Sequence, residues 1–316
     1  MINDKGLNMA EKINGFINID KALEMTSNDV IFRLKRLLFP IFGKVKIGHT
    51  GTLDPMASGV LPVAIGEATK TVQFQMENKK VYEFNIKFGE ERSTDDIEGE
   101  VIKKSDKIPT TEEIEAVIPS FLGKIEQVPP IYSAIKINGV RAYKLAREGK
   151  EVNIKPRENF VYELKIIERV SKDEVKFRVC ANKGFYVRAI ARDIARRLNS
   201  AGFVSYLRRI ANGPFNEANA ITLDKLEKIL QNPSQSLDVR KFDSDILLPV
   251  SFGLNDILAL DMNDGQNQKL RNGQWIKPDG FDLKSGALYQ IISNTKLSAI
   301  VKFEDGLLKT VRVFNL

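Results

Sequence analysis

The segment from Gly48 to Gly59 constrains the chain more than any other part of its sequence. It contains three glycines, Pro55 and His49, which is the only histidine. A proline fixes its own φ and biases the residue before it toward extended geometry, so Asp54-Pro55 favours a turn. The pattern predicts a tight loop that presents the carboxylate of Asp54, although aspartate also occurs in turns for purely structural reasons.

The cysteine and histidine content limits the chemistry that is open to the chain. Its single cysteine, Cys180, excludes an internal disulfide and a multi-cysteine metal site, and is typical of a reduced thiol in a cytosolic protein. One histidine excludes histidine-rich metal sites and acid–base schemes that need two histidines. The sequence has neither a P-loop nor a dinucleotide-binding glycine pattern, which disfavours nucleotide hydrolysis and hydride transfer. Carboxylates, Arg, Lys, Tyr and Ser/Thr are left to carry any reaction.

Length and charge indicate a two-domain protein with an acidic partner. The 316 residues correspond to about two domains of roughly 150 residues each. Forty-eight Lys and Arg against 41 Asp and Glu give a net charge of +7, which suits a polyanion. The N-terminus lacks a signal peptide, and the longest apolar runs, Val60–Ile65 and Ile246–Val250, fall short of the roughly 18 residues of a membrane span. We expect a cytoplasmic protein that does not enter a membrane.

Hydrophobic periodicity predicts the elements of a first, larger domain. Residues 11–20 end in a strand-like alternation, and Thr26–Asp29 supplies caps for an amphipathic helix that reaches Leu38. Two further helices and three strands are expected, at Thr111–Phe121 and Val187–Leu198, and at Val81–Phe88, Glu158–Val170 and Val175–Ala181. An acidic, polar loop with Thr94, Asp95 and Asp96 lies between residues 90 and 100.

The C-terminal part has a different composition. Asn232–Asp243 is rich in Asn, Ser, Gln and Asp, which indicates a linker. Beyond it, Leu258–Leu316 is predicted to form a small β-rich domain, because short alternating stretches are separated by Asn-Gly and Asp-Gly turns. The expected strands are Leu288–Ile292, Ser298–Phe303 and Thr310–Phe314.

Three arginines share one face of the predicted helix from Val187 to Leu198. At 100° per residue, Arg188, Arg192 and Arg196 form a stripe opposite the apolar stripe, so we expect them to face outward together. Such a stripe is often a solvated helix face, and it also suits the phosphates of an RNA backbone. An arginine beside a carboxylate keeps that carboxylate ionised, and an ionised, partly desolvated aspartate can act as a nucleophile. If Arg188 and Asp54 meet in space, the pair is therefore more than a turn residue and a surface charge.

A series of blocks, in a constant order over about residues 13–225, resembles the TruB-type tRNA pseudouridine-55 synthases. One departure concerns Lys21-Ala22-Leu23-Glu24, where that family usually has Lys-Pro-x-Gly, which leaves the path of this turn open. The blocks that carry the resemblance are Gly48–Pro55, Ser58–Pro62, Gly66–Lys70, Lys80–Tyr82, Thr94 with Asp96, Pro130–Lys136, Lys183–Arg188 and Tyr206–Arg209.

The resemblance implies an α+β pseudouridine synthase fold. Its central sheet is expected to be mixed and largely antiparallel, with helices flanking it. It further implies that residues 11–250 form the catalytic domain and that residues 254–316 form a small β-rich, PUA-like RNA-binding domain. The periodicity is compatible with this fold but does not produce its topology.

The implied activity is isomerisation of uridine to pseudouridine at position 55 in the T-loop of tRNA, without metal or cofactor. Asp54 would be the nucleophile, and attack on ribose C1′, attack on uracil C6 and an elimination through a glycal all remain open. Arg188 would hold Asp54 in an ion pair. Tyr82 would stack on the target base and help to move a proton, whereas without the resemblance it would be a cross-strand core aromatic. Leu207 would form an apolar wall.

The resemblance also implies residues that contact RNA. The target base must be extruded at a cost of a few kcal/mol, and His49 would occupy the vacated stacking position. Thr94 and Asp96 would lie in a loop that orders on RNA binding, and Tyr186 would contact the substrate. Phosphate contacts are expected from Lys21, Lys70, Lys136 and Arg192, together with Arg196.

The partner implied by the resemblance is the T-stem-loop of tRNA, with no metal, membrane or obligate protein partner. Two other functions stay open. The chain could instead act as a tRNA-folding chaperone independent of catalysis, or be an RNA-guided relative that works within a multi-protein particle. The absence of long basic tails from the sequence favours a stand-alone enzyme.

Overall fold

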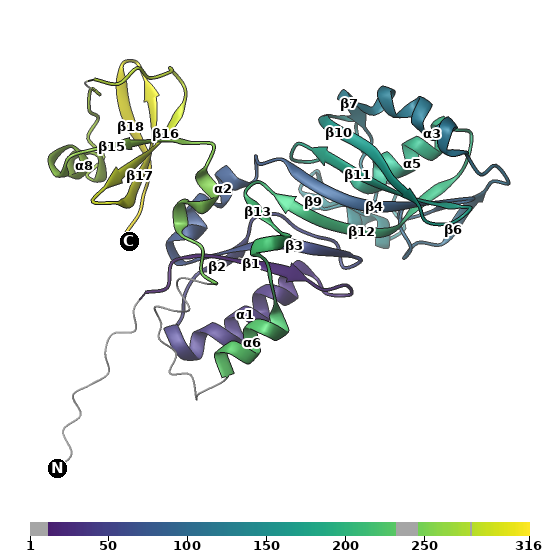
Figure 1. The fold of residues 1–316 in the computed structure, drawn as a ribbon, viewed down its shortest axis with the longest axis horizontal. Coiled ribbons are helices and arrows are strands. Elements are labelled where there is room, and N and C mark those ends of the chain that lie inside the picture. The colour runs from purple at the N-terminus through teal and green to yellow at the C-terminus, as the bar shows by residue number, and fades with distance from the viewer. Residues whose placement is uncertain (1–11, 232–245, 279) are drawn as a thin grey trace, which may run out of the picture.

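A ten-stranded mixed sheet forms the centre of the larger domain in the computed structural model (Figure 1). The structure describes residues 12–231, 246–278 and 280–316. The strands β1 and β14, and β3 and β12, pair in parallel, and the other pairs are antiparallel. The main path runs β14 (Ile221–Thr222), β1 (Gly15–Lys21), β3 (Ala57–Ile65), β12 (Gly202–Asn212), β4 (Lys80–Phe88), β11 (Glu174–Ala181), β10 (Arg157–Arg169) and β7 (Gly123–Gln127), while β2 (Ile47–His49) pairs with β3 and β13 (Phe215–Asn216) with β12.

Helices cover the sheet in two groups. Helices α1 (Ser27–Phe42) and α6 (Leu223–Gln231) lie side by side near β1, where Arg33 forms ion pairs with Asp224 and Glu227. Helix α1 begins with a capping box between Thr26 and Asp29. Helices α3 (Thr111–Val117) and α5 (Val187–Arg197) pack at the other end of the sheet, against β10 and against β4 and β12.

The core follows from the alternation of the central strands. On β11, and on β4 from Phe84 to Phe88, every second residue is buried, and the rings of Phe84 and Phe177 stack with their centroids 5.4 Å apart. All nine residues of β3 are buried, because apolar side chains pack on both faces of that strand. The packed sheet thereby fixes the position of β12 and of the loop that precedes β3.

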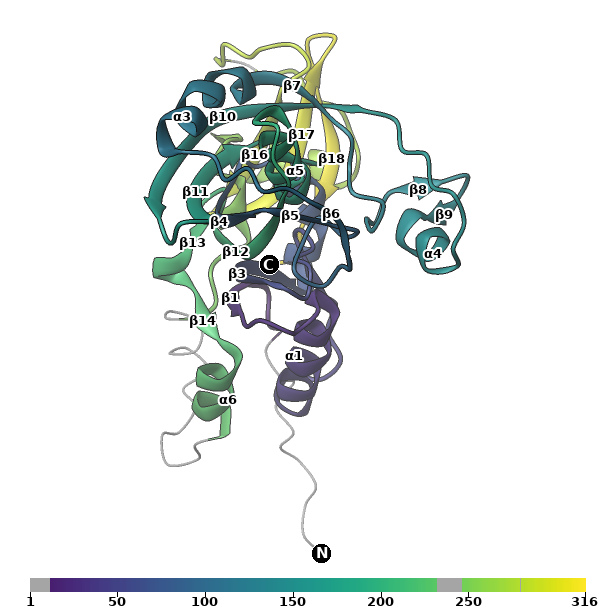
Figure 2. The same cartoon turned by 90° about the vertical axis from the view of Figure 1, so that its right-hand side faces the viewer.

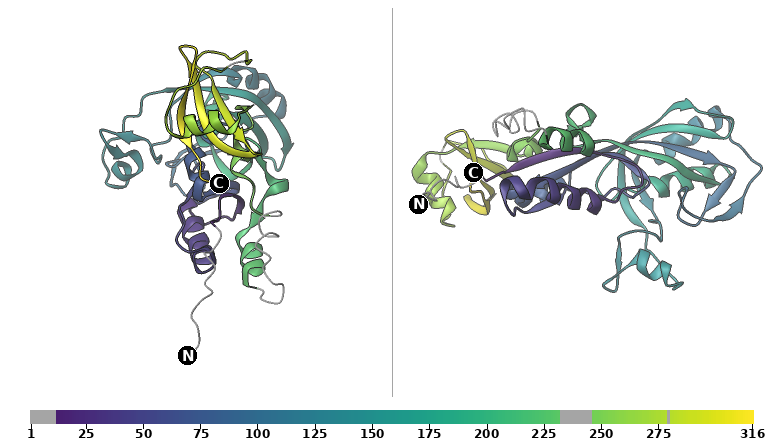
Figure 3. Two further views of the ribbon diagram at one scale, coloured as in Figure 1. Left: turned by 90° about the vertical axis from the view of Figure 1, so that its left-hand side faces the viewer. Right: turned by 90° about the horizontal axis from the view of Figure 1, so that it is seen from below.

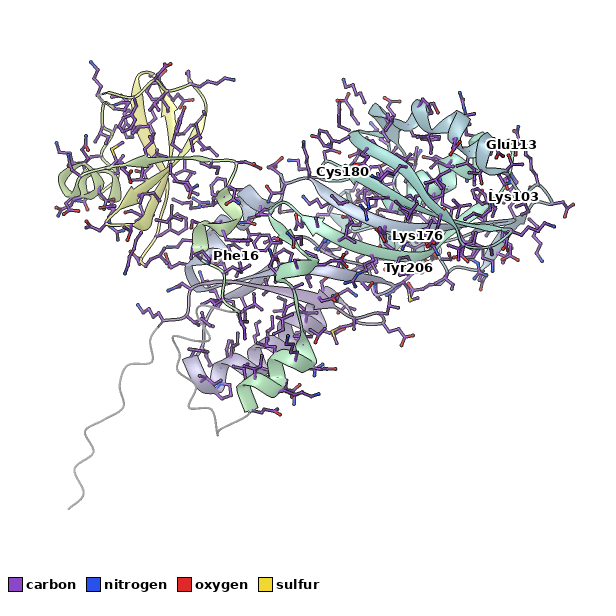
Figure 4. All side chains as sticks on the ribbon, viewed as in Figure 1. Phe16, Lys103, Glu113, Lys176, Cys180 and Tyr206 are labelled. Atoms are coloured by element: carbon purple, nitrogen blue, oxygen red, sulfur yellow. The ribbon has the colours of Figure 1, made fainter. Side chains whose placement is uncertain are left out.

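The other face of the sheet near β11 is polar. Cys180 lies on this half-exposed face together with Lys176 of the same strand and Tyr206 of β12 (Figure 4). Lys176 pairs with Glu83 at 3.0 Å, and its ammonium lies 5.9 Å from the centroid of the Tyr206 ring. Burial raises the pKa of the Cys180 thiol, so the thiol stays protonated near neutral pH.

A small four-stranded sheet forms the C-terminal domain, at the end of the molecule opposite α3 and α5 (Figures 1 and 3). Its strands are β15 (Leu258–Asp261), β16 (Leu288–Ser293), β17 (Lys296–Glu304) and β18 (Leu307–Val313), and helix α8 (Asp264–Arg271) packs on them. The 3₁₀ segments η1 (Gly66–Thr71) and η4 (Val250–Leu254), with the short helix α2 (Val72–Gln75), lie at the junction with the larger domain. A third 3₁₀ turn, η3 (Glu217–Asn219), connects β13 and β14.

Two smaller segments project from the larger sheet. An arm made of β8 (Lys136–Ile137), β9 (Val140–Arg141) and α4 (Ala142–Arg147) extends away from the sheet (Figure 2). A hairpin of β5 (Glu90–Arg92) and β6 (Val101–Lys104) replaces the start of the polar loop expected between residues 90 and 100. The hairpin and the segment that leads to the arm lie beside α5, and the hairpin's loop and the arm both contribute to the site described below.

The expected α+β class and most of the expected elements are confirmed, with shifts of a few residues at the ends. Helix α3 ends at Val117 and continues as the 3₁₀ turn η2 (Ile118–Phe121), because Pro119 lacks the backbone N–H of a helix. The long strand β12 was not predicted from the sequence. The expected linker Asn232–Asp243 lies outside the described residues.

Candidate active site

The loop from Thr50 to Pro55 opens onto a cavity of about 780 Å³. The cavity lies between this loop, the pocket-facing residues of β4 and β12, and the turn that leads into α5. The loop after β5 and the arm close its other side. Its lining includes Asp54, Lys80, Tyr82, Thr94, Asp96, Glu98, Tyr132, Tyr143, Arg147, Tyr186, Arg188, Leu207 and Arg209.

Arg188 and Asp54 meet at the wall of this cavity. An Arg188 guanidinium nitrogen lies 2.9 Å from Asp54 Oδ2, and another lies 3.1 Å from Asp96 Oδ2. The Arg188 side chain is 8% exposed, whereas that of Asp54 is 45% exposed. A buried arginine thus holds a carboxylate that remains open to a ligand, which is the arrangement that a nucleophilic aspartate requires.

Arg188 is fixed by two loops that come from distant parts of the chain. It donates hydrogen bonds to the carbonyl oxygens of Thr94 and Tyr132, at 2.9 and 3.1 Å. The side chain of Thr94 donates to Asp96, and Asp96 Oδ1 accepts a hydrogen bond from the backbone N–H of Glu98. The guanidinium therefore has little freedom to turn away from Asp54.

Hydrogen bonds from several elements hold the Asp54 loop in place. Ser27 Oγ accepts from the N–H of Leu53 and donates to its carbonyl, at 2.8 and 3.0 Å. Arg209 donates to the carbonyl of Gly51 at 3.0 Å, and the N–H of Glu24 donates to the carbonyl of Pro55 at 2.9 Å. These contacts come from β12, from the start of α1 and from the turn after β1, so the loop is anchored on both sides.

The turn after β1 is where the sequence departs from the Lys-Pro-x-Gly pattern. Glu24 stands at the glycine position of that pattern and has a φ of +60°, in the left-handed region that favours glycine. The turn thus keeps the backbone conformation that a glycine would adopt, and it still reaches Pro55. The path of this turn, which the sequence left open, is therefore compatible with the anchored loop.

Tyr82, Leu207 and Tyr186 bring apolar surface to the cavity. Tyr82 lies on β4 opposite Val179, and Leu207 lies on the neighbouring strand β12 with 9% of its surface exposed. Tyr186 precedes α5, and burial raises the pKa of its hydroxyl. Together with Asp54, they form a pocket with one ionic corner and apolar walls, which suits a flat, uncharged ring.

The expectation of an outward-facing arginine stripe is wrong for Arg188 and Arg192. Both are buried, because the loop after β5 and the segment that leads to the arm fold over this side of α5. Arg192 donates to Asp95 at 2.8 Å, to Asp193 at 3.0 Å and to the carbonyl of Val128 at 2.8 Å. With each of its nitrogens engaged inside the protein, Arg192 is not placed to contact a phosphate.

Arg196 is half-exposed, and its guanidinium pairs with the buried carboxylate of Glu91. The loop that carries Thr94 and Asp96, expected to order on RNA binding, is already folded onto α5 here, and Asp95 and Asp96 are buried. The arginines of α5 thus serve as partners for the carboxylates of this loop.

Lys21 lies in surroundings that the sequence did not indicate. It is fully buried and donates to the carbonyl oxygens of Ala22, Met25 and Pro55, so in this structure it is not placed to contact a phosphate. Burial lowers the pKa of Lys21 to about 8, against the opposing effect of Asp54. Its place is beneath the Asp54 loop.

The remaining expected contacts lie outside the cavity lining. Lys70 is half-exposed and bonds Glu67 and the carbonyl of Val313, between the two domains. Lys136 is exposed on the arm. His49 lies on β2 in a separate surface hollow with Phe39 and Thr69, and burial, reinforced by Arg209, lowers its pKa and favours the neutral ring.

Lys80 and Arg209 line the cavity and were given no role from the sequence. Both belong to blocks that carry the family resemblance, and Lys80 shares the cavity face of β4 with Tyr82 at a spacing of two residues. That alternation was the available signal. Within the described residues, no group of three or more His, Cys, Asp or Glu side chains could hold a metal ion. Nor does the described part of the chain contain a helix long and apolar enough to cross a membrane.

Two family models match consecutive parts of the chain. One is described as TruB family pseudouridylate synthase (N terminal domain) and matches residues 39–187, and the other is described as tRNA pseudouridylate synthase B C-terminal domain and matches residues 188–254.

Curated proteins called tRNA pseudouridine synthase B are similar over nearly the whole chain. That of Bradyrhizobium diazoefficiens is 43% identical over 306 residues, with 96% of this chain and 86% of the relative covered. That of Ehrlichia ruminantium is 43% identical over 305 residues, with 95% and 99% covered.

Solved structures share the fold. A chain in the crystal structure of a Cbf5-Nop10-Gar1 complex has a TM-score of 0.73 and 25% identity, over 95% of this chain and 84% of that one. A chain in an H/ACA RNP bound to a substrate RNA containing 2′-deoxyuridine has a TM-score of 0.71 and 23% identity, over 96% and 85%. These likenesses agree with the mixed sheet, its flanking helices and the small C-terminal sheet.

Proposed function

The chain belongs to the TruB family of pseudouridylate synthases, and from this membership we propose that it converts uridine 55 in the T-loop of tRNA to pseudouridine. The observation that carries the proposal is the ion pair between Asp54 and the buried Arg188, placed where the apolar walls of Tyr82 and Leu207 face the same cavity. The relatives that cover most of the chain are called tRNA pseudouridine synthases, which supports tRNA as the substrate.

The reaction is an isomerisation that needs no co-reactant. The bond between ribose C1′ and uracil N1 breaks, the uracil turns in the cavity, and C5 bonds to C1′. The proton on C5 leaves, and N1 gains one. Asp54 starts the reaction as a nucleophile at C1′ or at C6, or by promoting a glycal, and Arg188 holds its carboxylate in place through the 2.9 Å contact. Tyr82 stacks on the base and helps to move the proton, because it is the aromatic on the β4 wall.

Access to the cavity requires that the target nucleotide leave its stack in the T-loop. Extrusion costs a few kcal/mol, and a neutral aromatic ring that fills the gap reduces this cost. His49 suits this role, since its half-buried ring lines a surface hollow outside the cavity, and its lowered pKa favours the uncharged imidazole. Lys136 on the exposed arm contacts phosphate, and the C-terminal β domain, residues 254–316, adds RNA-binding surface to the catalytic domain, residues 11–250.

The test of the nucleophile is Asp54→Asn assayed on a bare T-stem-loop RNA. We expect pseudouridine formation to fall on the order of 10³-fold or more, because the amide removes the nucleophile, while RNA affinity changes by less than about fivefold. Asp106→Asn is the matched control, since Asp106 is exposed and remote from the cavity lining. Normal turnover by Asp54→Asn would contradict the assignment.

The same assay separates the other two functions. Turnover of bare RNA by the isolated wild-type protein supports a stand-alone enzyme, and a requirement for a guide RNA or a second protein would contradict it. A tRNA-refolding assay with Asp54→Asn measures any chaperone effect, because that variant separates folding assistance from catalysis.

A further inference from the structure

Two cations lie together on the strand wall of the cavity. Lys80 and Arg209 come from the neighbouring strands β4 and β12, where Arg209 pairs in register with Tyr82 and Lys80 pairs with Asn212. Both side chains line the cavity, although Lys80 is only 7% exposed and Arg209 only 1%. They are therefore close to a bound nucleoside and largely shielded from solvent.

Neither cation has a carboxylate partner among the described residues. The two other buried arginines, Arg188 and Arg192, each lie within 3.1 Å of aspartate oxygens. Arg209 instead donates to the carbonyl oxygens of Val60 and Gly51, from Nε and Nη2, at 2.7 and 3.0 Å. No acceptor for its Nη1 is found in the part of the chain that the structure describes.

Lys80 is held in a similar way. Its ammonium donates to the carbonyl oxygens of Met76 and Asn78, at 2.6 and 2.5 Å, which leaves one of its three N–H groups for another acceptor. The nearby acid Glu77 pairs with Lys183 instead. Carbonyl dipoles orient both cations but do not neutralise them.

Keeping two unneutralised charges in a partly buried wall is costly. Burial lowers the pKa of Lys80 to about 8, and the positive charge of Arg209 is the next largest cause. Arg209 also acts to lower the pKa of Lys21 and of His49. This part of the cavity therefore has an excess of positive charge that a bound anion would offset.

We propose that Lys80 and the Nη1 edge of Arg209 form an anion subsite that binds one backbone phosphate of the RNA strand, adjacent to the nucleoside held at Asp54. The inference rests on the proposed function, since the RNA substrate supplies the phosphate. The cations that line the cavity thus differ in their counter-charges. Arg188 is neutralised by Asp54 and Asp96, whereas Lys80 and Arg209 are neutralised only by the substrate.

This arrangement gives the cavity a means of orienting the strand. A phosphate bound at Lys80 fixes the position of the ribose along the wall, and the ribose must be aligned for C1′ or the base to face Asp54. Because a phosphate contact is independent of base identity, the subsite contributes affinity and positioning without reading the sequence.

The first experiment measures RNA affinity against salt concentration for Lys80→Met, which removes the charge but keeps a side chain of similar length. Each phosphate contact to a single strand contributes about 0.7 to the slope of log K against log salt. We expect Lys80→Met to lower the slope by about that amount and to weaken binding about tenfold at low salt. Lys80→Arg should keep the wild-type slope. Lys172→Met is the matched control, as Lys172 is exposed in the turn between β10 and β11, away from the cavity lining.

The second experiment replaces single phosphates beside the target uridine with uncharged methylphosphonates. A methylphosphonate at one position should weaken binding to the wild-type protein about tenfold. The same methylphosphonate should leave the RNA affinity of Lys80→Met almost unchanged. If every position weakens both proteins equally, Lys80 contacts no phosphate and the subsite is overturned. An unchanged salt slope would overturn it as well. If Lys80→Met does not fold, the scan on wild-type protein decides alone, since the subsite requires one sensitive position.

Wild-type turnover of unmodified RNA is recorded in the same series. Turnover together with equal methylphosphonate effects in both proteins rejects the subsite and leaves the proposed function intact. Absence of wild-type turnover on a T-stem-loop rejects the proposed function itself.

Discussion

Glu24 adopts a left-handed backbone conformation, with a φ of +60°, in the exposed turn that supports the Asp54 loop. A non-glycine residue in this region costs about 1–2 kcal/mol, because its Cβ crowds the backbone. The turn is nevertheless kept, since its N–H bonds the carbonyl of Pro55 and Lys21 bonds the same carbonyl from below. The strain at Glu24 is thus balanced by contacts that fix the Asp54 loop.

Glu24→Gly should raise the free energy of unfolding by about 0.5–1 kcal/mol, because relief of the strain exceeds the added entropy of glycine in the unfolded chain. Urea unfolding of the wild type and the variant measures this difference. Glu24→Ala is the control, since it removes the carboxylate and keeps the Cβ, and we expect it to match the wild type. A less stable Glu24→Gly would show that the turn is not strained.

The sequence predicted which residues carry the chemistry of the site better than it predicted how each of them is surrounded. The tight turn at Asp54-Pro55 follows from local backbone preferences, and the ion pair with Arg188 was a stated condition that the structure meets. Lys21 shows the limit, because lysines are usually solvated and nothing local indicates that three carbonyl oxygens enclose this one. Burial of a charge depends on chain segments that meet only in the fold.

At the scale of elements, α5 clamps two loops through its arginines. Arg188 and Arg192 hold the loop after β5 through Thr94 and Asp95, and they hold the segment leading to the arm through the carbonyls of Tyr132 and Val128. Burial raises the pKa of Asp95 to about 6, and Arg192 acts against this rise. The clamp thus depends on Arg192 to keep a buried carboxylate ionised.

Arg192→Met should lower the free energy of unfolding by about 3–5 kcal/mol at pH 8, because it leaves the Asp95 carboxylate buried without a counter-charge. The loss should be smaller at pH 5.5, because Asp95 then takes up a proton, and the neutral carboxyl group needs no counter-charge. Chemical unfolding at both pH values measures this, and Asp95→Asn in the same background should recover part of the loss. The salt slope of RNA binding should stay at the wild-type value, and a lower slope would restore Arg192 as a phosphate contact.

Periodicity identified strands whose two faces differ and helices with a clear cap, such as β4, β11 and α1. It could not give the direction of the arginine stripe, because α5 buries residues on nearly all sides and two separate loops supply the partners of its arginines. Strand β3 is apolar on both faces, so its sequence lacks an alternation that would mark it. The missing information was non-local in each case.

At the scale of the whole molecule, the two domains share one apolar cluster. Phe16 and Phe215 of the larger domain, and Ile300 and Phe314 of the C-terminal domain, are buried in it. Polar contacts border the cluster: Lys70 donates to the carbonyl of Val313, and Glu67 accepts from the N–H of Asn315. The end of β18 is thus bound to η1, which directly follows β3.

Phe314→Ala should uncouple the unfolding of the two domains. Deleting a fully buried phenylalanine costs about 3–5 kcal/mol, and here the loss falls on the contact between the domains. Trp275, the only tryptophan of the chain, lies in the C-terminal domain beside Lys309, so its fluorescence reports that domain, while circular dichroism at 222 nm follows the helices of the larger one. In the wild type the two thermal transitions should coincide, because the shared cluster must open in one step. In Phe314→Ala the fluorescence transition should come first, and RNA affinity should fall with kcat nearly unchanged, since the cavity is formed by the larger domain.

Phe281→Ala, at an exposed position of the same small domain, should leave the transitions coincident. Coincident transitions in Phe314→Ala would show that the polar contacts at η1 suffice to hold the domains together.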